Sequence, residues 1–275
     1  MKDDLAEGNF DPATGALAYG FYFLERLSSR PAVSNIIKEL AEALENLSWK
    51  SERGRYWKSK LKQDDSVYLG ISHGTAAILV FLSKAIRAGV PINCFELVRE
   101  ASEYVVSHSR DNHATFFPVI VGESNDYHMH ANNWCYGDPG TLYGLLQAAL
   151  LLKDDRLRDF VLDKYKTVVK RENSETYLVA GYGLLYGNAG LAAMYRKCYE
   201  QTDAAFFAQA YNDQIRLLLD NYNPCDAVLG YKGYWNQEVE VTNYCMAEGL
   251  IGIALTLMGD KDRKMTCYFD PFFLF

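Results

Sequence analysis

The chain has 275 residues, of which 49% are hydrophobic and 23% charged, a balance typical of a globular protein with a sizeable core. Its net charge of −7, without a long run of Lys and Arg, argues against a nucleic-acid-binding surface. No positively charged segment followed by an apolar core opens the chain, and the first ten residues carry three acidic side chains, so we expect neither a signal peptide nor a membrane span. A cytoplasmic protein without membrane or nucleic-acid partners is the resulting expectation.

The cysteines are spaced too widely and unevenly for a disulfide framework or a Cys-x-x-Cys zinc ribbon. There are six of them: Cys94, Cys135, Cys198, Cys225, Cys245 and Cys267. Most are therefore expected to be small, buried, apolar side chains.

A glycine-led apolar segment recurs five times and is the main structural signal of the sequence. In each copy, a glycine and two further residues are followed by Gly or Ala, and an apolar run continues from there. The leading glycines are Gly15, Gly74, Gly137, Gly187 and Gly249. Their intervals of 50 to 63 residues fit a helical hairpin with its loop, as in solenoids and toroids.

Amphipathic stretches with charge on one side lie between the glycine-led segments and are the expected outer helices. They span residues 33–47, 95–108, 156–170 and 204–219. The glycine-led segments are apolar on nearly all sides, which is typical of closely packed inner helices. We therefore predict an all-α chain whose residues 1–275 form a single α/α barrel or toroid domain of about five helical hairpins.

Parallel inner helices would bring the residues that precede the glycines to one mouth of the ring. Those residues are Thr14, His73, Tyr136, Tyr186 and Glu248. Helix N-termini carry partial positive charge and unpaired N–H groups, so the mouth is expected to favour anions, thiolates or a developing enolate. The alternative is that the glycines serve only close helix packing.

Two short motifs carry a family resemblance. Residues 134–140, with the sequence WCYGDPG, and the tripeptide Ser72, His73 and Gly74 resemble signatures of the lanthionine synthetase C-like family of lantibiotic cyclases. The resemblance implies an α/α toroid, with seven hairpins in the family, and one bound zinc ion. The zinc activates a substrate cysteine thiolate, which adds to a dehydroamino acid and closes a thioether ring.

The resemblance assigns roles to four residues of this chain. Cys135 matches a zinc ligand, His73 an acid/base histidine, Tyr136 the adjacent tyrosine and Asp11 an aspartate of an earlier repeat. The remaining pocket candidates are Thr14, Asp138, Tyr186 and Glu248.

Three functional positions of the family are altered. Its Cys-His zinc pair falls on Leu185 and Tyr186, which cannot replace a thiolate and an imidazole, and its arginine falls on Ala131. We therefore predict a degenerate member in which zinc is not expected to bind. A rearranged site could instead use Cys135, His73 and Glu248 as three ligands.

The resemblance covers five of the seven family hairpins, so the chain is expected to be shortened at its N-terminus. It would be either a fragment or a ring that is open or differently closed. An open ring would expose an apolar flank to a protein partner.

Three functions stay open. The preferred one is a non-catalytic protein that binds a peptide at the mouth. The second is an active peptide cyclase with a rearranged zinc site. The third is a carbohydrate-active α/α barrel, for which Asp138 and Glu248 are the candidate carboxylate pair.

Overall fold

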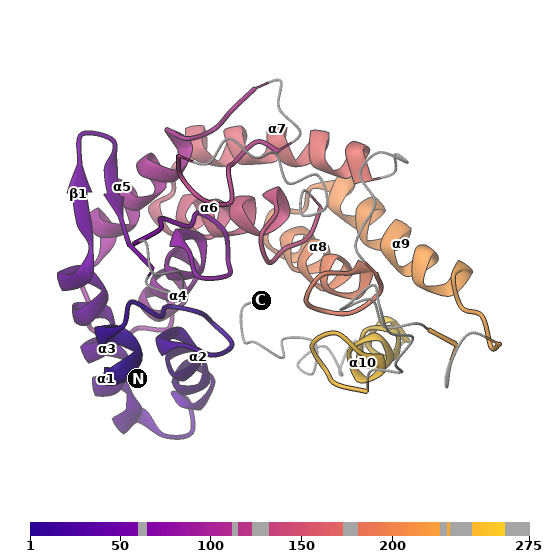
Figure 1. Cartoon of the computed structure of the whole chain (residues 1–275), viewed down its shortest axis with the longest axis horizontal. Helices are drawn as coiled ribbons and strands as arrows, with labels where there is room; N and C mark the ends of the chain where they lie inside the picture. The colour runs from indigo at the N-terminus through magenta and orange to yellow at the C-terminus, as the bar shows by residue number, and fades with distance from the viewer. Residues whose placement is uncertain are drawn as a thin grey trace. The chain divides into compact units, whose positions relative to one another are not determined.

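The structure is a computed structural model, and the part of the chain described here is all-helical apart from one two-stranded hairpin (Figure 1). The described residues are 1–59, 65–111, 115–122, 132–172, 181–225, 230–231 and 244–261. They fall into two compact units. Unit 1 holds described residues up to 122 together with 136–165, and unit 2 holds 132–135 together with the described residues from 166 to 261. The single-domain assignment stays a prediction.

The predicted helices are present, and each starts within one residue of the predicted position. The glycine-led helices are α2 (Ala16–Arg26), α4 (Thr75–Arg87), α6 (Asp138–Leu152), α8 (Asn188–Thr202) and α10 (Leu250–Lys261). The amphipathic helices are α3 (Ser34–Leu47), α5 (Phe95–Val106), α7 (Asp155–Glu172) and α9 (Ala205–Asp220). Each glycine-led helix begins one residue after its glycine. The short helices α1 (Lys2–Ala6) and η1 (Pro31–Val33) were not predicted.

A glycine precedes these helices because the preceding loop folds back onto the helix end. A Cβ atom at Gly74 would lie 2.6 Å from the carbonyl oxygen of Gly70 and 2.7 Å from that of Tyr68. At Gly187 it would lie 2.5 Å from the carbonyl oxygen of Gly181. The obstacles are backbone atoms and cannot rotate away, so space rather than backbone conformation demands glycine here.

The same loops accept hydrogen bonds from first-turn N–H groups. In α4, the N–H of Thr75 donates to the carbonyl of Tyr68 (3.1 Å) and that of Ala76 to Leu69 (3.0 Å). In α8, the first three N–H groups likewise donate to the carbonyls of residues 181, 182 and 183. The expectation of unpaired N–H groups is therefore wrong for α8 and for the first two N–H groups of α4. At these groups only the helix dipole remains to favour an anion.

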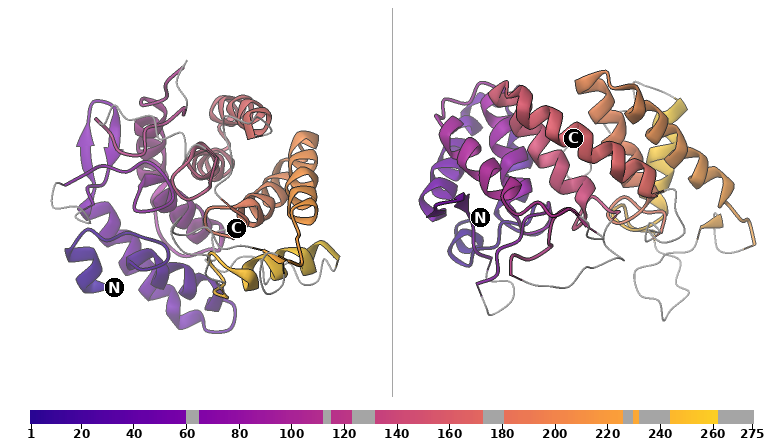
Figure 2. Two further views of the ribbon diagram at one scale, coloured as in Figure 1. Left: turned by 45° about the vertical axis from the view of Figure 1, so that its right-hand side comes forward. Right: turned by 90° about the horizontal axis from the view of Figure 1, so that it is seen from above.

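Helices α4 and α6 form the closest helix pair of unit 1 (Figures 1 and 2). A Cβ atom at Gly144 of α6 would lie 2.7 Å from the Cβ atom of Ala76 on α4, so small residues let the two backbones approach. The hydroxyl of Tyr165 on α7 donates to the carbonyl of Pro139 (2.7 Å) and is fully buried. The start of α6 is thereby held against both α4 and α7.

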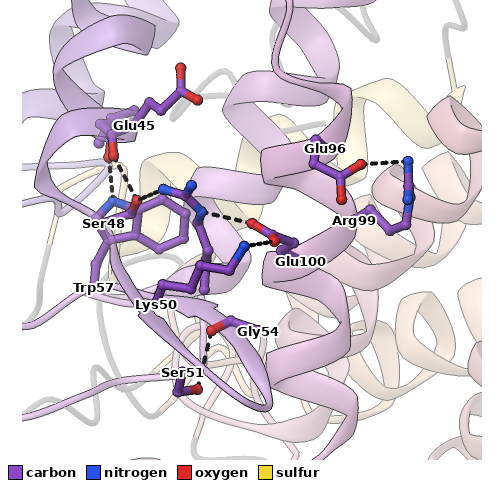
Figure 3. A network of polar contacts seen from close by, with 11 residues as sticks. Glu45, Ser48, Lys50, Ser51, Gly54, Trp57, Glu96, Arg99 and Glu100 are labelled. Atoms are coloured by element: carbon purple, nitrogen blue, oxygen red, sulfur yellow. Dashed lines mark hydrogen bonds and ion pairs between the residues drawn. The ribbon is translucent and has the colours of Figure 1, made fainter.

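An unpredicted antiparallel hairpin, β1 (Trp49–Ser51) and β2 (Gly54–Tyr56), packs on α5. Glu100 of α5 accepts from both strands: from the Lys50 ammonium group and from Nε of Arg55 at 2.7 Å (Figure 3). These two donors hold the pKa of Glu100 below its usual value. The hairpin is thus attached to the helix by charge-assisted hydrogen bonds.

Unit 2 is built around α8 and α9, which run along each other (Figure 2). Between them, the Asn188 amide donates to Oε1 of Gln214 (2.7 Å) in a buried contact. The apolar core of this unit consists of Leu184, Ala189, Ala192, Ile215, Leu218, Tyr231, Leu250 and Ile253. Among the described residues, none of the helices combines the length and apolar character needed to cross a bilayer.

Candidate functional site

The three residues with catalytic roles by resemblance lie together in unit 1. Nε2 of His73 is 3.2 Å from the Tyr136 hydroxyl oxygen, within hydrogen-bonding distance. Nδ1 of His73 is 3.2 Å from Oδ2 of Asp11. That distance suits an ion pair, but the ring N–H is not aligned for a hydrogen bond, so we treat the Asp11 contact as electrostatic. The imidazole thus lies between a carboxylate and a phenol.

Asp11 is fixed by the turn that precedes α2. Its Oδ1 accepts from the backbone N–H groups of Ala13 (2.8 Å) and Thr14 (2.7 Å) and from the Thr14 hydroxyl (3.1 Å). The residue is only 5% exposed, and its Oδ2 faces His73. Thr14, predicted as a pocket residue, therefore helps to hold Asp11 in place.

His73 has a left-handed backbone conformation, with φ of 63°. Residues with a Cβ atom rarely adopt it, and it costs on the order of 1–3 kcal/mol unless the surroundings impose it. The ring of Tyr68 meets the His73 ring edge-on, with centroids 5.6 Å apart. The His73 side chain remains 20% exposed, so the ring is confined without being sealed from solvent.

Burial lowers the pKa of His73, and the negative charge of Asp11 offsets only part of this effect. The lowered pKa favours the neutral form of the imidazole. A neutral imidazole can accept a hydrogen bond or a proton at one ring nitrogen while the other carries hydrogen.

Asp138 is buried, and both carboxylate oxygens accept backbone hydrogen bonds. Oδ2 accepts from the N–H of Phe116 (2.9 Å) and Oδ1 from that of Phe117 (3.0 Å). A glycosidase acid or base must instead exchange protons with its substrate. The geometry of Asp138 therefore gives no support to the carbohydrate alternative.

In unit 2, Trp134 of the WCYG motif contacts the loop that precedes α8. The indole Nε1 of Trp134 donates to the carbonyl oxygen of Leu184, the residue before Leu185 and Tyr186. A Cβ atom at Gly190 would collide with both partners of this bond, which accounts for the second glycine of that repeat. Cys135, which follows Trp134, is buried. The family's zinc-ligand positions thus lie on two segments that the Trp134 bond joins.

These segments do not carry a zinc donor set. Leu185 has no donor atom, and the neutral phenol of Tyr186 is a poor ligand beside the single thiol of Cys135. The described residues contain no group of three or more His, Cys, Asp or Glu side chains that could hold a metal ion. Catalytic zinc takes three protein ligands and an open position, so the donors on these two segments do not fit it. The rearranged set of Cys135, His73 and Glu248 combines residues of both units and stays a prediction.

Tyr186 and Glu248 lie on neighbouring loops of unit 2, because the N–H of Leu185 donates to the carbonyl of Ala247 (2.7 Å). Burial raises the pKa of Glu248. Of the five predicted mouth residues, the structure therefore groups Thr14, His73 and Tyr136 in unit 1 and these two in unit 2. A mouth common to all five stays a prediction, and Ala131 lies outside the described residues.

Tyr68 is a site residue that sequence reasoning missed. It contacts the His73 ring and accepts from the first N–H of α4 through its carbonyl. Asn9 and Gly181 occupy the same place, six residues before their own glycines, and make the same backbone contact. The three positions share no residue type, so no signal in the sequence pointed to Tyr68.

Comparison with known proteins places the chain in a family. A family model described as "Lanthionine synthetase C-like protein" matches residues 1–269. The curated "Glutathione S-transferase LANCL1" of Danio rerio is 28% identical over 137 residues, 49% of this chain and 31% of that protein. The solved structure of "Nisin cyclase" superposes with a TM-score of 0.73 at 15% identity, covering 98% of this chain and 67% of that chain.

These matches carry different weight. The match to the zebrafish protein spans about a third of that protein's length, so its activity does not transfer by itself. At 15% identity, the structural likeness shows the fold alone, and it confirms the predicted all-α toroid class. The family model spans nearly the whole sequence, and the chain therefore belongs to the lanthionine synthetase C-like family.

Proposed function

We propose that this protein recognises cysteine-containing peptides without a zinc ion and does not form thioether rings. The observation that carries the proposal is an asymmetry in the site. The Asp11, His73 and Tyr136 contacts are retained, whereas Leu185 and Tyr186 occupy the positions of two family zinc ligands.

A peptide thiol connects the name of one relative with the chemistry that the family resemblance implies. One relative is named a glutathione S-transferase, and glutathione is a cysteine-containing tripeptide. The other is named a cyclase, and the family resemblance implies that a peptide cysteine is the nucleophile in cyclisation. A cysteine-containing peptide is therefore the ligand class that we assign to this chain.

Loss of zinc favours binding over chemistry. A free cysteine thiol has a pKa of about 8.5, so most of it is protonated at neutral pH, and the thiolate is the nucleophile. The neutral His73 ring and the Tyr136 hydroxyl can still form hydrogen bonds to a peptide. The site can thus recognise such a ligand without activating it strongly.

A zinc-free enzyme is the second candidate, and the contact between His73 and Asp11 favours it. His73 would accept the proton of the ligand thiol while Asp11 stabilises the imidazolium. The lowered pKa of His73 makes it a weaker base than an unperturbed histidine, which is why we prefer recognition.

Metal analysis and peptide binding together test the proposal. Protein purified without chelators or added metal is assayed for zinc, with Cys135→Ala as the control. Calorimetry then measures binding of cysteine-containing peptides, reduced glutathione among them, and of matched serine peptides. We expect far less than one zinc per chain, and saturable binding that prefers cysteine and weakens in His73→Ala.

Stoichiometric zinc that Cys135→Ala removes would overturn the zinc-free site. Absence of saturable binding by every peptide would overturn recognition.

A further inference from the structure

A strap formed by residues 115–122 pairs with the backbone that leads to His73. The N–H of Leu69 donates to the carbonyl of Val119 (3.3 Å), and the N–H of Val121 donates to the carbonyl of Val67 (2.9 Å). An antiparallel bridge between Tyr68 and Ile120 lies between these two bonds. Residues 67–69 are therefore held from both sides, by the strap and by the first turn of α4.

The other end of the strap is attached to α6 through Asp138. Both oxygens of this 1%-exposed carboxylate accept strap N–H groups, from Phe116 and Phe117. Hydrogen bonds to an ionised carboxylate are stronger than those between neutral groups, and the helix N-terminus stabilises the same negative charge. The attachment is thus both buried and charge-assisted.

The repeat itself does not require a carboxylate at this position. Asn188 occupies the corresponding first position of α8, after Gly187, and bonds to the side chain of Gln214 on α9 instead of to a loop. The contact of Asp138 with the strap is therefore particular to the repeat that contains the WCYG motif.

We propose that Asp138 is a positioning residue for His73. Its carboxylate fixes the strap, the strap fixes residues 67–69, and these hold His73 through the Tyr68 ring and the backbone bond to Thr75. The left-handed conformation of His73 persists because this framework imposes it. The consequence for ligand binding rests on the proposed function, but the geometric claim does not.

The test measures His73 in the free protein, without any peptide. The variants are Asp138→Ala and Asp138→Asn, with Asn188→Ala as the matched control at the corresponding position of α8. Diethyl pyrocarbonate modification of His73 is followed by mass spectrometry well above the ordinary histidine pKa of about 6.5, so that every variant carries a neutral ring. Amide hydrogen exchange is measured at Leu69 and Val121.

Asp138→Ala should raise the His73 modification rate and the exchange rate at Leu69 and Val121 about tenfold, as expected for losing a buried charge-assisted hydrogen bond. Asp138→Asn keeps one acceptor oxygen, so its rates should lie between those of wild type and alanine. Asn188→Ala should lower the unfolding midpoint and leave these three rates unchanged.

The proposal is overturned if His73 reacts no faster in Asp138→Ala than in Asn188→Ala, because both would then report only general destabilisation. Should Asp138→Ala fail to fold, Asp138→Asn decides, and wild-type rates at His73, Leu69 and Val121 in that variant would overturn the proposal. Because no peptide is present, failure of peptide binding leaves this result intact. The two failures are therefore distinguishable.

Discussion

Nε2 of His73 lies 3.2 Å from the hydroxyl oxygen of Tyr136, although 63 positions separate the two residues in the sequence. Each stands immediately before the glycine of a different repeat, and the pairing of α4 with α6 brings the two helix starts together. Asp11, from the turn before α2, approaches the opposite nitrogen of the ring. Three repeats thus contribute one polar group each to the same place.

The Tyr136 hydroxyl should contribute to peptide affinity. Tyr136→Phe removes the hydroxyl and keeps the ring, so we expect binding to weaken about three- to tenfold, as for loss of one hydrogen bond. Calorimetry with the tightest cysteine-containing peptide measures the change, and Tyr19→Phe on the exposed part of α2 is the control. Equal affinity of Tyr136→Phe and wild type would exclude the hydroxyl from the site.

Histidine 73 should make stability depend on pH. Because its folded pKa is lowered, the unfolded chain binds the proton more readily, and stability should fall as pH drops from 6.5 through the folded value. Urea unfolding across this window measures the effect. His73→Asn, which tolerates the left-handed conformation and does not titrate, should show a smaller decline. An equal decline in both proteins would assign the pH dependence to other groups.

The backbone of His73 gives a separate prediction. His73→Gly should be more stable than His73→Ala by about 1 kcal/mol, because glycine adopts a φ of 63° without steric cost whereas alanine does not. Chemical denaturation of the two variants measures the difference, and both lack the imidazole. If His73→Ala were the more stable variant, the backbone strain at position 73 would be relieved in solution.

Attachment of the hairpin should depend on the charge of Glu100. Lys50 and Arg55 lower the pKa of Glu100 in the folded protein. Its contribution to stability is therefore present above pH 4.5, the ordinary pKa of Glu, and is lost as the pH falls through the lower pKa of the folded state. Glu100→Gln should accelerate amide exchange in the hairpin at neutral pH.

Glu96→Gln on the same helix provides the control for Glu100. Its exposed pair with Arg99 (Figure 3) should change stability by no more than about 0.5 kcal/mol. Equal exchange rates in the hairpin for the two variants would contradict a specific role of Glu100.

Restoring the lost ligands should restore zinc binding. The double variant Leu185→Cys and Tyr186→His places a thiol and an imidazole on the loop that Trp134 binds, beside Cys135. We expect it to approach one zinc per chain by elemental analysis, with wild type far below that, because three protein ligands suffice for a catalytic-type site. Failure of the double variant to gain zinc would mean that the backbone geometry has also diverged.

Helix starts were predictable because their causes are local. Apolar periodicity and a glycine at the helix boundary are both contained within one repeat, and each predicted start lies within one residue of the observed one. The WCYG and Ser-His-Gly motifs likewise indicated the family, because they concentrate its signature in a few adjacent residues. The same motifs selected His73 and Tyr136, and the resemblance added Asp11 from an earlier repeat; the structure brings the three together.

Other features were decided only by tertiary structure, because they depend on contacts between segments far apart in the chain. The sequence predicts that Asp138 is a pocket carboxylate, yet its oxygens accept hydrogen bonds from backbone N–H groups of a loop that carries no motif. The sequence predicts open anion sites at the helix N-termini, yet the loops before α4 and α8 accept hydrogen bonds from the first N–H groups of these helices. Backbone donors and acceptors leave no mark in the side-chain pattern, so their pairing emerges only when the chain is folded.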